Sequence, residues 1–114
     1  MPDANLVILM GRVGRDPEIK TTQNGTVIAN VALATTERWV QDGEKKEATN
    51  WHRVVAFGRT AEIVSQYVHK GSPLYLEGSL QTRTYEQDGQ KKYIVEVKAR
   101  SVQLLESRKQ EDPF

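Results

Sequence analysis

The sequence predicts an all-β fold in which five strands form one small barrel and a single α-helix lies between the third and fourth strands. Two observations carry this prediction. Apolar and polar residues alternate along most of the chain, and only residues 60–70 change to helical spacing. The strand patterns are also long and contain glycines, which is typical of strands that bend around a barrel.

The first strand pattern covers residues 5–13 and is followed by turns. Gly11 and Gly14 belong to a Gly-Arg-Val-Gly stretch that does not match a phosphate-binding loop. We interpret both as glycines that let a barrel strand bend and turn. Residues 14–25 contain Asp-Pro and Asn-Gly steps, so they are predicted to be a turn-rich connection.

The second and third strand patterns cover residues 27–36 and 49–58. Asp42-Gly43 lies between them, in a polar stretch, and residues 39–50 are therefore predicted to be a hairpin loop longer than a two-residue turn. The second strand alternates, and its predicted inward row is Val27, Ala29, Val31 and Leu33.

Residues 60–70 predict the helix. Thr60 is placed as the N-cap, and the Lys-Gly-Ser-Pro sequence at residues 70–73 is a stop signal. The apolar residues at helical spacing are predicted to face the core, Tyr67 among them. They are Ile63, Val64, Tyr67 and Val68.

The last two strand patterns cover residues 74–85 and 92–105, with a turn at residues 87–90. Gly78 inside the first of them predicts a bend or bulge. The final strand has one apolar row, formed by Tyr93, Val95, Val97 and Ala99. Together these elements predict an OB-fold, a five-stranded, partly open Greek-key barrel, over residues 1–106, with a short flexible tail over residues 107–114.

Composition excludes several classes of function. The chain has 114 residues, no cysteine and two distant histidines, so disulfides, thiolate catalysis and cysteine-bound zinc are excluded. Metalloprotease, Ser-His-Asp and P-loop patterns are absent. We therefore expect no catalytic residues, no metal and no cofactor. No apolar run reaches the ~18 residues that a membrane span requires, and a signal peptide is not expected.

Charge is distributed unevenly. The net charge is +1, but residues 1–110 hold all 16 Lys and Arg against 13 Asp and Glu (15 minus 2), which gives +3. The final residues Glu111-Asp112-Pro113-Phe114 carry the other two acids and no base. A basic body with an acidic tip indicates two kinds of partner.

The aromatic residues indicate one of these partners. In TNWHRVVAFG the odd positions Trp51, Arg53 and Phe57 share one face of a strand. Trp39 lies beside Arg38 in a polar stretch, and Tyr85 shares a face with Arg83. Single-stranded nucleic acid stacks its bases on flat rings and its phosphates contact cations. The residues alone leave a second interpretation open, in which the rings are barrel core with basic neighbours.

The chain strongly resembles the bacterial-type single-stranded DNA-binding protein family, SSB. The matching stretches are NLVILMGRVGRDPEIK, NGTVIANVALATTERW, TNWHRVVAFGRTAEIVSQYVHKGSPLYLEGSLQTRTY and the final Pro-Phe, in the order of the family. The resemblance implies an OB-fold that binds single-stranded DNA without catalysis. The stacking aromatics it implies are Trp39, Trp51, Phe57 and Tyr85, the last of which is typically Trp in the family. The phosphate-contacting cations it implies are Lys20, Arg53, Arg59, Lys70 and Arg83.

The resemblance also implies an assembly. Family members are usually homotetramers, residues 5–10 match a first strand that pairs between subunits, and Leu6 and Ile8 belong to that strand. His52 matches a histidine at a subunit interface, on the face opposite Trp51. The acidic tip of the family recruits replication and repair proteins, and here it corresponds to Glu111, Asp112, Pro113 and Phe114.

The expected function is therefore protection of single-stranded DNA during replication, recombination and repair. The linker before the tip is short, which indicates a phage, plasmid or other mobile-element version, or a specialised paralogue. The expected location is the bacterial cytoplasm or nucleoid, or the host cytoplasm if the protein is phage-encoded. The alternative is a primosome-type OB-fold accessory protein that acts mainly through protein contacts. An enzyme on an OB scaffold is a third class, because fold alone does not define function.

Overall fold

Six strands and one helix make up the part of the chain that the computed structural model describes, residues 2–105. In chain order they are β1 (Val7–Val13), β2 (Glu18–Thr21), β3 (Val27–Gln41), β4 (Glu44–Phe57), α1 (Gly58–Tyr67), β5 (Pro73–Gln87) and β6 (Gln90–Leu104). Within residues 2–105, no helix has the length and apolar character needed to cross a membrane.

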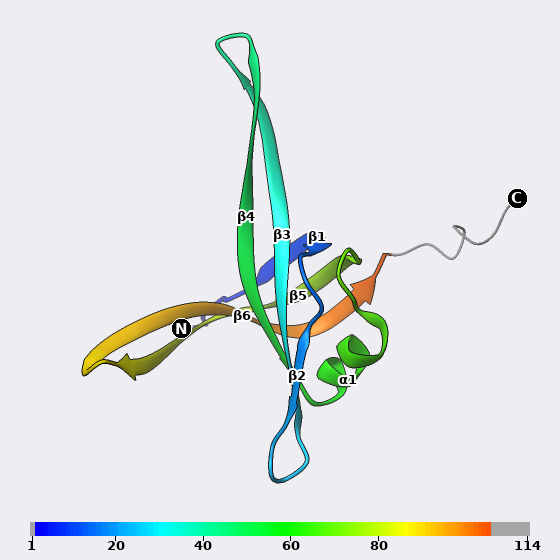
Figure 1. Ribbon diagram of the computed structural model, residues 1–114, viewed down its shortest axis with the longest axis vertical. Coiled ribbons are helices and arrows are strands. Elements are labelled where there is room, and N and C mark those ends of the chain that lie inside the picture. The colour runs from blue at the N-terminus through cyan, green and yellow to red at the C-terminus, as the bar shows by residue number, and fades with distance from the viewer. Residues whose placement is uncertain (1, 106–114) are drawn as a thin grey trace, which may run out of the picture.

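The strands close into a barrel. They follow the order β1-β5-β6-β4-β3-β2, and a further pairing of β1 with β3 joins the two sides of the sheet. Neighbouring strands are antiparallel except β4 and β6, which are parallel (Figure 1). The predicted all-β OB-fold is confirmed, and the barrel of β1, β3, β4, β5 and β6 is closed rather than partly open.

The short strand β2 was not predicted. Its residues pair with Val27–Asn30 of β3, so the turn is confined to residues 22–26, where Thr22 Oγ1 accepts a hydrogen bond from the Thr26 amide at 3.1 Å. Every side chain of β2 is exposed. A strand with no buried face has no apolar alternation. The sequence of residues 14–25 therefore contained turn signals but no pattern that predicts a strand.

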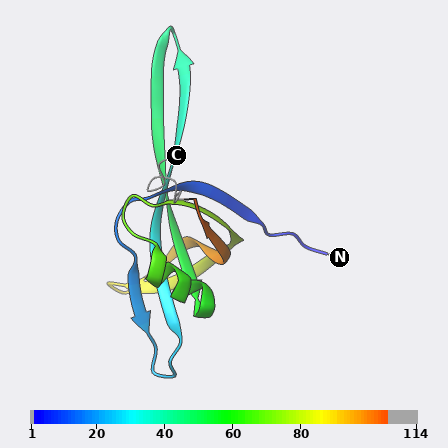
Figure 2. The same ribbon diagram turned by 90° about the vertical axis from the view of Figure 1, so that its right-hand side faces the viewer.

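Residues 39–50 are not a loop, and that prediction was wrong. β3 continues to Gln41 and β4 begins at Glu44, so the connection is the two-residue turn Asp42-Gly43. Both residues have positive φ, 51° and 76°, as the turn that matches the twist of a hairpin requires. The result is a long ribbon, here named the β3–β4 arm (residues 35–50), which extends away from the barrel in Figures 1 and 2. Its residues are polar because most are exposed to solvent.

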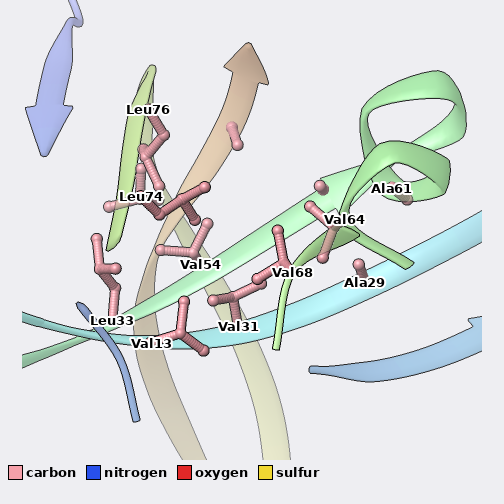
Figure 3. Packing of buried hydrophobic residues seen from close by; sticks show 13 residues of the cluster. Val13, Ala29, Val31, Leu33, Val54, Ala61, Val64, Val68, Leu74 and Leu76 are labelled. Carbon is pink, nitrogen blue, oxygen red and sulfur yellow. The ribbon is translucent and has the colours of Figure 1, made fainter. Parts of the chain in front are cut away.

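The core fills the barrel and the space under α1 (Figure 3). The predicted inward row of β3 is confirmed for Ala29, Val31 and Leu33, which are buried, and Val27 is half-buried. Tyr67 was predicted to be core but is 58% exposed, because α1 buries only Ala61 and Val64.

The start of the helix also differs from the prediction. The N-cap is Phe57, which has no side-chain capping bond, and not Thr60. The Thr60 hydroxyl instead donates a hydrogen bond to the Arg100 carbonyl of β6 at 3.3 Å. Thr60 therefore ties α1 to the barrel, a long-range contact that a capping pattern does not reveal.

β5 and β6 form a second ribbon, the β5–β6 arm (residues 80–96). The predicted irregularity at Gly78 is confirmed, because the register shifts between Glu77 and Gly78. Tyr93 and Val95 belong to the same apolar row as Val97, but both are exposed. β4 pairs with β6 only near Val97, so the arm has no core to face beyond that point.

Gly11 permits the closure of the barrel. β1 pairs with β5 and then turns to β3 at Arg12 and Val13, and a Cβ at Gly11 would collide with the carbonyl oxygen of Ala34 on β3. The interpretation of Gly11 as a bend glycine is therefore confirmed, with Ala34 as the reason.

Gly11→Ala is expected to lower the free energy of unfolding by about 1–3 kcal/mol, the usual cost of overpacking a site bounded by backbone. Urea denaturation followed by circular dichroism measures this as a lower midpoint with an unchanged slope. Gln23→Ala, in an exposed turn, is the control. An unchanged midpoint for Gly11→Ala would mean that β1 moves away from β3 without cost.

Candidate nucleic-acid interface

A basic groove lies beside the point at which β4 and β6 separate. Its volume is about 520 Å³, and its walls come from β2, β3, β4 and the β5–β6 arm. It contains four cations and one acid, a local charge of +3 (four minus one). These charged residues are Arg15, Lys20, Arg53, Arg83 and Glu18. The structure thus brings together three of the predicted phosphate-contacting cations, Lys20, Arg53 and Arg83, and adds Arg15.

Trp51 forms one edge of the groove with an exposed ring. It lies on β4, is 63% exposed, and shares its outward face with Arg53 and Phe57 as predicted. The ring packs on Gly14, where a Cβ would collide with ring atoms Cζ3 and Cη2. Gly14 therefore leaves room for the indole, a role that its sequence context did not reveal.

Phe57 ends β4 on the same face and carries a cation that was not predicted. The Nζ of Lys98 lies 5.4 Å from the centre of the Phe57 ring, in cation–π range. Lys98 pairs with Val55 across the β4–β6 seam, which places it between Arg53 and Phe57. The alternation of the last strand placed Lys98 opposite the core row, but only the pairing of β4 with β6 shows that it reaches Phe57.

Trp39 lies on the β3–β4 arm, outside the groove. It is opposite Lys46 in the hairpin, and a hollow of about 490 Å³ is formed there by Arg38, Trp39, Val40, Lys45, Lys46 and Glu47. The predicted association of Trp39 with basic residues is confirmed. Arg38 and Lys46 pair with Glu47 and Glu44 at 3.5 and 3.2 Å, and these side chains remain largely exposed. The arm therefore offers a second ring with cations around it.

Tyr85 lies on the β5–β6 arm opposite Lys92 and is partly exposed. On the same arm, Arg83 forms a two-point ion pair with Glu96, from Nε to Oε1 at 3.3 Å and from Nη2 to Oε2 at 2.9 Å. These hydrogen bonds, and then the charge of Glu96, raise the pKa of Arg83 above its ordinary value.

Two predicted cations lie elsewhere. Arg59 is exposed near the start of α1 and pairs with Glu62 at 3.4 Å. Lys70 follows the helix, and its backbone amide donates to Asp16 Oδ1 at 2.8 Å. Neither residue lines the groove, so their DNA contacts remain predictions.

The residues predicted at a subunit interface occupy two places. His52 is half-buried on the face of β4 opposite Trp51, and its Nε2 lies 2.8 Å from Thr35 Oγ1. Leu6 and Ile8 are exposed, and Met10 continues their row along β1. Ile8 and Met10 lie beside Glu77 and Tyr75 of β5, where the Tyr75 hydroxyl donates to Glu77 at 2.6 Å and this bond raises the pKa of Tyr75. The tip, Glu111 to Phe114, lies outside the described residues.

The fold and the groove define a class: an OB-fold barrel that carries exposed rings among cations. The sequence profile of the Single-strand binding protein family matches residues 4–105. The chain belongs to this family.

Solved structures of similar proteins agree with this assignment. An SSB of Plasmodium falciparum, solved as a complex with ssDNA, is 33% identical with a TM-score of 0.85, over 93% of this chain and 98% of that chain. A deletion mutant of the single-stranded DNA binding protein from Thermus aquaticus is 34% identical with a TM-score of 0.80. That match covers 93% of this chain and 52% of the Thermus chain.

Proposed function

We propose that this protein binds single-stranded DNA, without catalysis and with little sequence preference, and protects it during replication, recombination and repair. The observation that carries the proposal is the open Trp51 ring at the edge of a groove with four cations. The similar Plasmodium protein was solved with ssDNA, which supports the same ligand here.

The geometry supplies the two interactions that a single strand needs. Unpaired bases stack on exposed rings, at about 1–3 kcal/mol per base. Phosphates are attracted to the groove, where Arg15, Lys20 and Arg53 lie beside Trp51. A strand that stacks on Trp51 and Phe57 follows the outer face of β4, and it reaches further rings on the two arms at Trp39 and Tyr85.

Low sequence preference follows from the same contacts. Every base has a flat face that can stack, and every nucleotide has the same phosphate, so neither interaction distinguishes one base from another. The duplex is disfavoured, because its bases are already stacked on each other and cannot lie on Trp51.

Trp51→Ala is expected to weaken binding by about 1–3 kcal/mol, the contribution of one stacked base. Tyr93→Ala is the matched control, because Tyr93 is equally exposed but lies on the β5–β6 arm outside the groove. Fluorescence anisotropy of a labelled oligo(dT) measures both affinities, with circular dichroism to confirm folding. Equal affinities for the two variants would refute the assignment of the groove as the binding surface.

We also propose that the protein is a homotetramer or, failing that, a dimer. Ile8 and Met10 on β1, with Leu6 just before the strand, form an exposed apolar row, and each loses its contact with water if a second copy covers it. Within the described part of the chain, residues 7–10 of β1 pair only with β5, so one backbone edge of the strand is open to pairing between subunits. His52 contacts a subunit in this proposal through the face opposite Trp51.

Ile8→Glu is expected to dissociate the oligomer, because it places a charge in the centre of the apolar row. Light scattering coupled to size exclusion is expected to give about four times 12.9 kDa for the native chain and a smaller mass for the variant. Val40→Glu, on the exposed β3–β4 arm, is the control and keeps the native mass. A monomeric native chain at micromolar concentration would exclude the assembly.

For the tip we propose recruitment of replication and repair proteins. Phe114 enters an apolar pocket of the partner, while the acids Glu111 and Asp112 meet basic residues at the rim. Residues 107–110 span at most ~14 Å at ~3.3–3.6 Å per residue, so the partner binds close to the barrel.

Deletion of residues 111–114 is expected to leave DNA affinity unchanged, or slightly higher at low salt, where an acidic tip competes weakly with DNA for the groove. The same deletion is expected to abolish capture of replication and repair proteins from a bacterial extract, as identified by mass spectrometry. Gln110→Ala serves as the control. If the shortened chain still captures the same proteins, the tip has no recruiting role.

A further inference from the structure

Glu96 is a buried carboxylate that pairs with Arg83, one of the residues that line the basic groove. It is 5% exposed, and within residues 2–105 it is the only charged residue that is buried. It precedes Val97, the residue of β6 that pairs with Val54 of β4, just as Arg53 precedes Val54. A buried carboxylate is costly unless it is paired, and a negative charge here opposes the binding of phosphates. Its presence requires a function that offsets both effects.

The carboxylate is paired with Arg83. The carboxylate accepts the Nε–H at 3.3 Å and one Nη2 N–H at 2.9 Å, so it binds the side edge of the guanidinium. An Arg side chain has five N–H donors. Two remain on Nη1 and one on Nη2, along the other edge, while the Arg83 side chain is 56% exposed and lines the groove.

We propose that Glu96 is a positioning residue for the single strand: it holds the side edge of Arg83 so that the free edge of the guanidinium faces a backbone phosphate in the groove. This inference rests on the proposed function and assigns a role to a residue that does not itself touch DNA. Arg and phosphate match in a two-point geometry, which a fixed guanidinium offers at little entropic cost.

The pair makes Arg83 different from Arg53. Arg83 and Glu96 together are neutral, so Arg83 contributes directed hydrogen bonds more than net charge. Arg53 has no salt bridge within the described part of the chain and contributes its full charge to the groove. Removing the contribution of Arg53 and removing that of Arg83 are therefore expected to change the salt dependence of DNA affinity differently. This salt dependence distinguishes a positioning role from electrostatic attraction between a cation and a phosphate.

The test is the affinity for oligo(dT) over a series of salt concentrations, measured by anisotropy for the native chain, Glu96→Gln, Glu96→Asp and Arg53→Ala. Glu96→Gln removes the opposing charge, so its slope of log K against log[salt] steepens by up to roughly 0.7. It also releases Arg83, so at high salt it binds about tenfold more weakly, near the lower end of what one hydrogen bond to a charged group contributes. The plots of log K against log[salt] for the native chain and for Glu96→Gln are therefore expected to cross.

Glu96→Asp separates position from charge. It keeps the carboxylate but is one methylene too short for the two-point contact, so it is expected to retain the native slope and lose affinity at every salt concentration. Arg53→Ala is expected to lower the slope magnitude by roughly 0.7, the value for one phosphate contact with a single strand.

Binding by Glu96→Gln that equals or exceeds the native affinity at every salt concentration would overturn the proposal, because the carboxylate would then only oppose DNA. A lower melting temperature with unchanged affinity would also overturn it, since Glu96 would then be purely structural. If Glu96→Gln does not fold, Arg83→Lys replaces it: a lysine keeps the charge without the second edge. About tenfold weaker binding is expected for it at high salt, and native affinity would overturn the proposal.

Failure of the proposed function gives a different result. In that case the native chain itself does not bind oligo(dT), and Arg53→Ala has no effect to measure. When the native chain binds and Arg53→Ala weakens it, the Glu96 variants alone decide the inference.

Discussion

The short parallel seam between β4 and β6 determines where the barrel ends and the two arms begin. Only Val54↔Val97 and Val55↔Lys98 pair across it. These pairs join β4 to β6 within the barrel, and the burial of Val54 and Val97 fixes them there. Before the seam the two strands have no common ladder, so each continues with its own hairpin partner as a separate arm (Figure 1). The groove lies in the space that this separation opens.

Each functional feature is placed by its distance from that seam. Arg53 and Glu96 come one residue before it, Trp51 three residues before Val54, and Lys98 and Phe57 at or after it. Side chains alternate along each strand, so one face of β4 fills the core while the other carries Trp51, Arg53 and Phe57. The buried contact between Val54 and Val97 thus positions the outer face of β4, where the side chains for base stacking and phosphate contacts lie.

The sequence predicted the barrel, the helix and the aromatic face of β4, because these follow from local periodicity. It failed where a segment has no buried face. β2 and the β3–β4 arm are exposed strands, and composition alone made both resemble loops. The assignment of Tyr67 to the core failed for a related reason: the regular pattern continues past the end of the core, as it also does along β6 at the exposed Tyr93.

For the candidate site, sequence identified the rings and three groove cations but not their neighbours. The seat of Trp51 on Gly14, the approach of Lys98 to Phe57 and the burial of Glu96 under Arg83 all join residues distant in sequence. A sequence motif identifies which side chains are present, whereas the register of the paired strands determines which of them are in contact. Glu96 in particular occupies a position that alternation assigned to the polar side of β6.

Photo-crosslinking of oligo(dT) to the native protein, followed by mass spectrometry of the cross-linked peptides, locates the DNA-binding surface. Cross-links are expected at the rings that border the groove and the arms, with Trp51 the strongest and Phe57, Tyr85 and Trp39 beside it. Cross-links confined to Tyr67 and Tyr75, which lie on the helix and on the β1–β5 face, would contradict a DNA-binding surface at the groove.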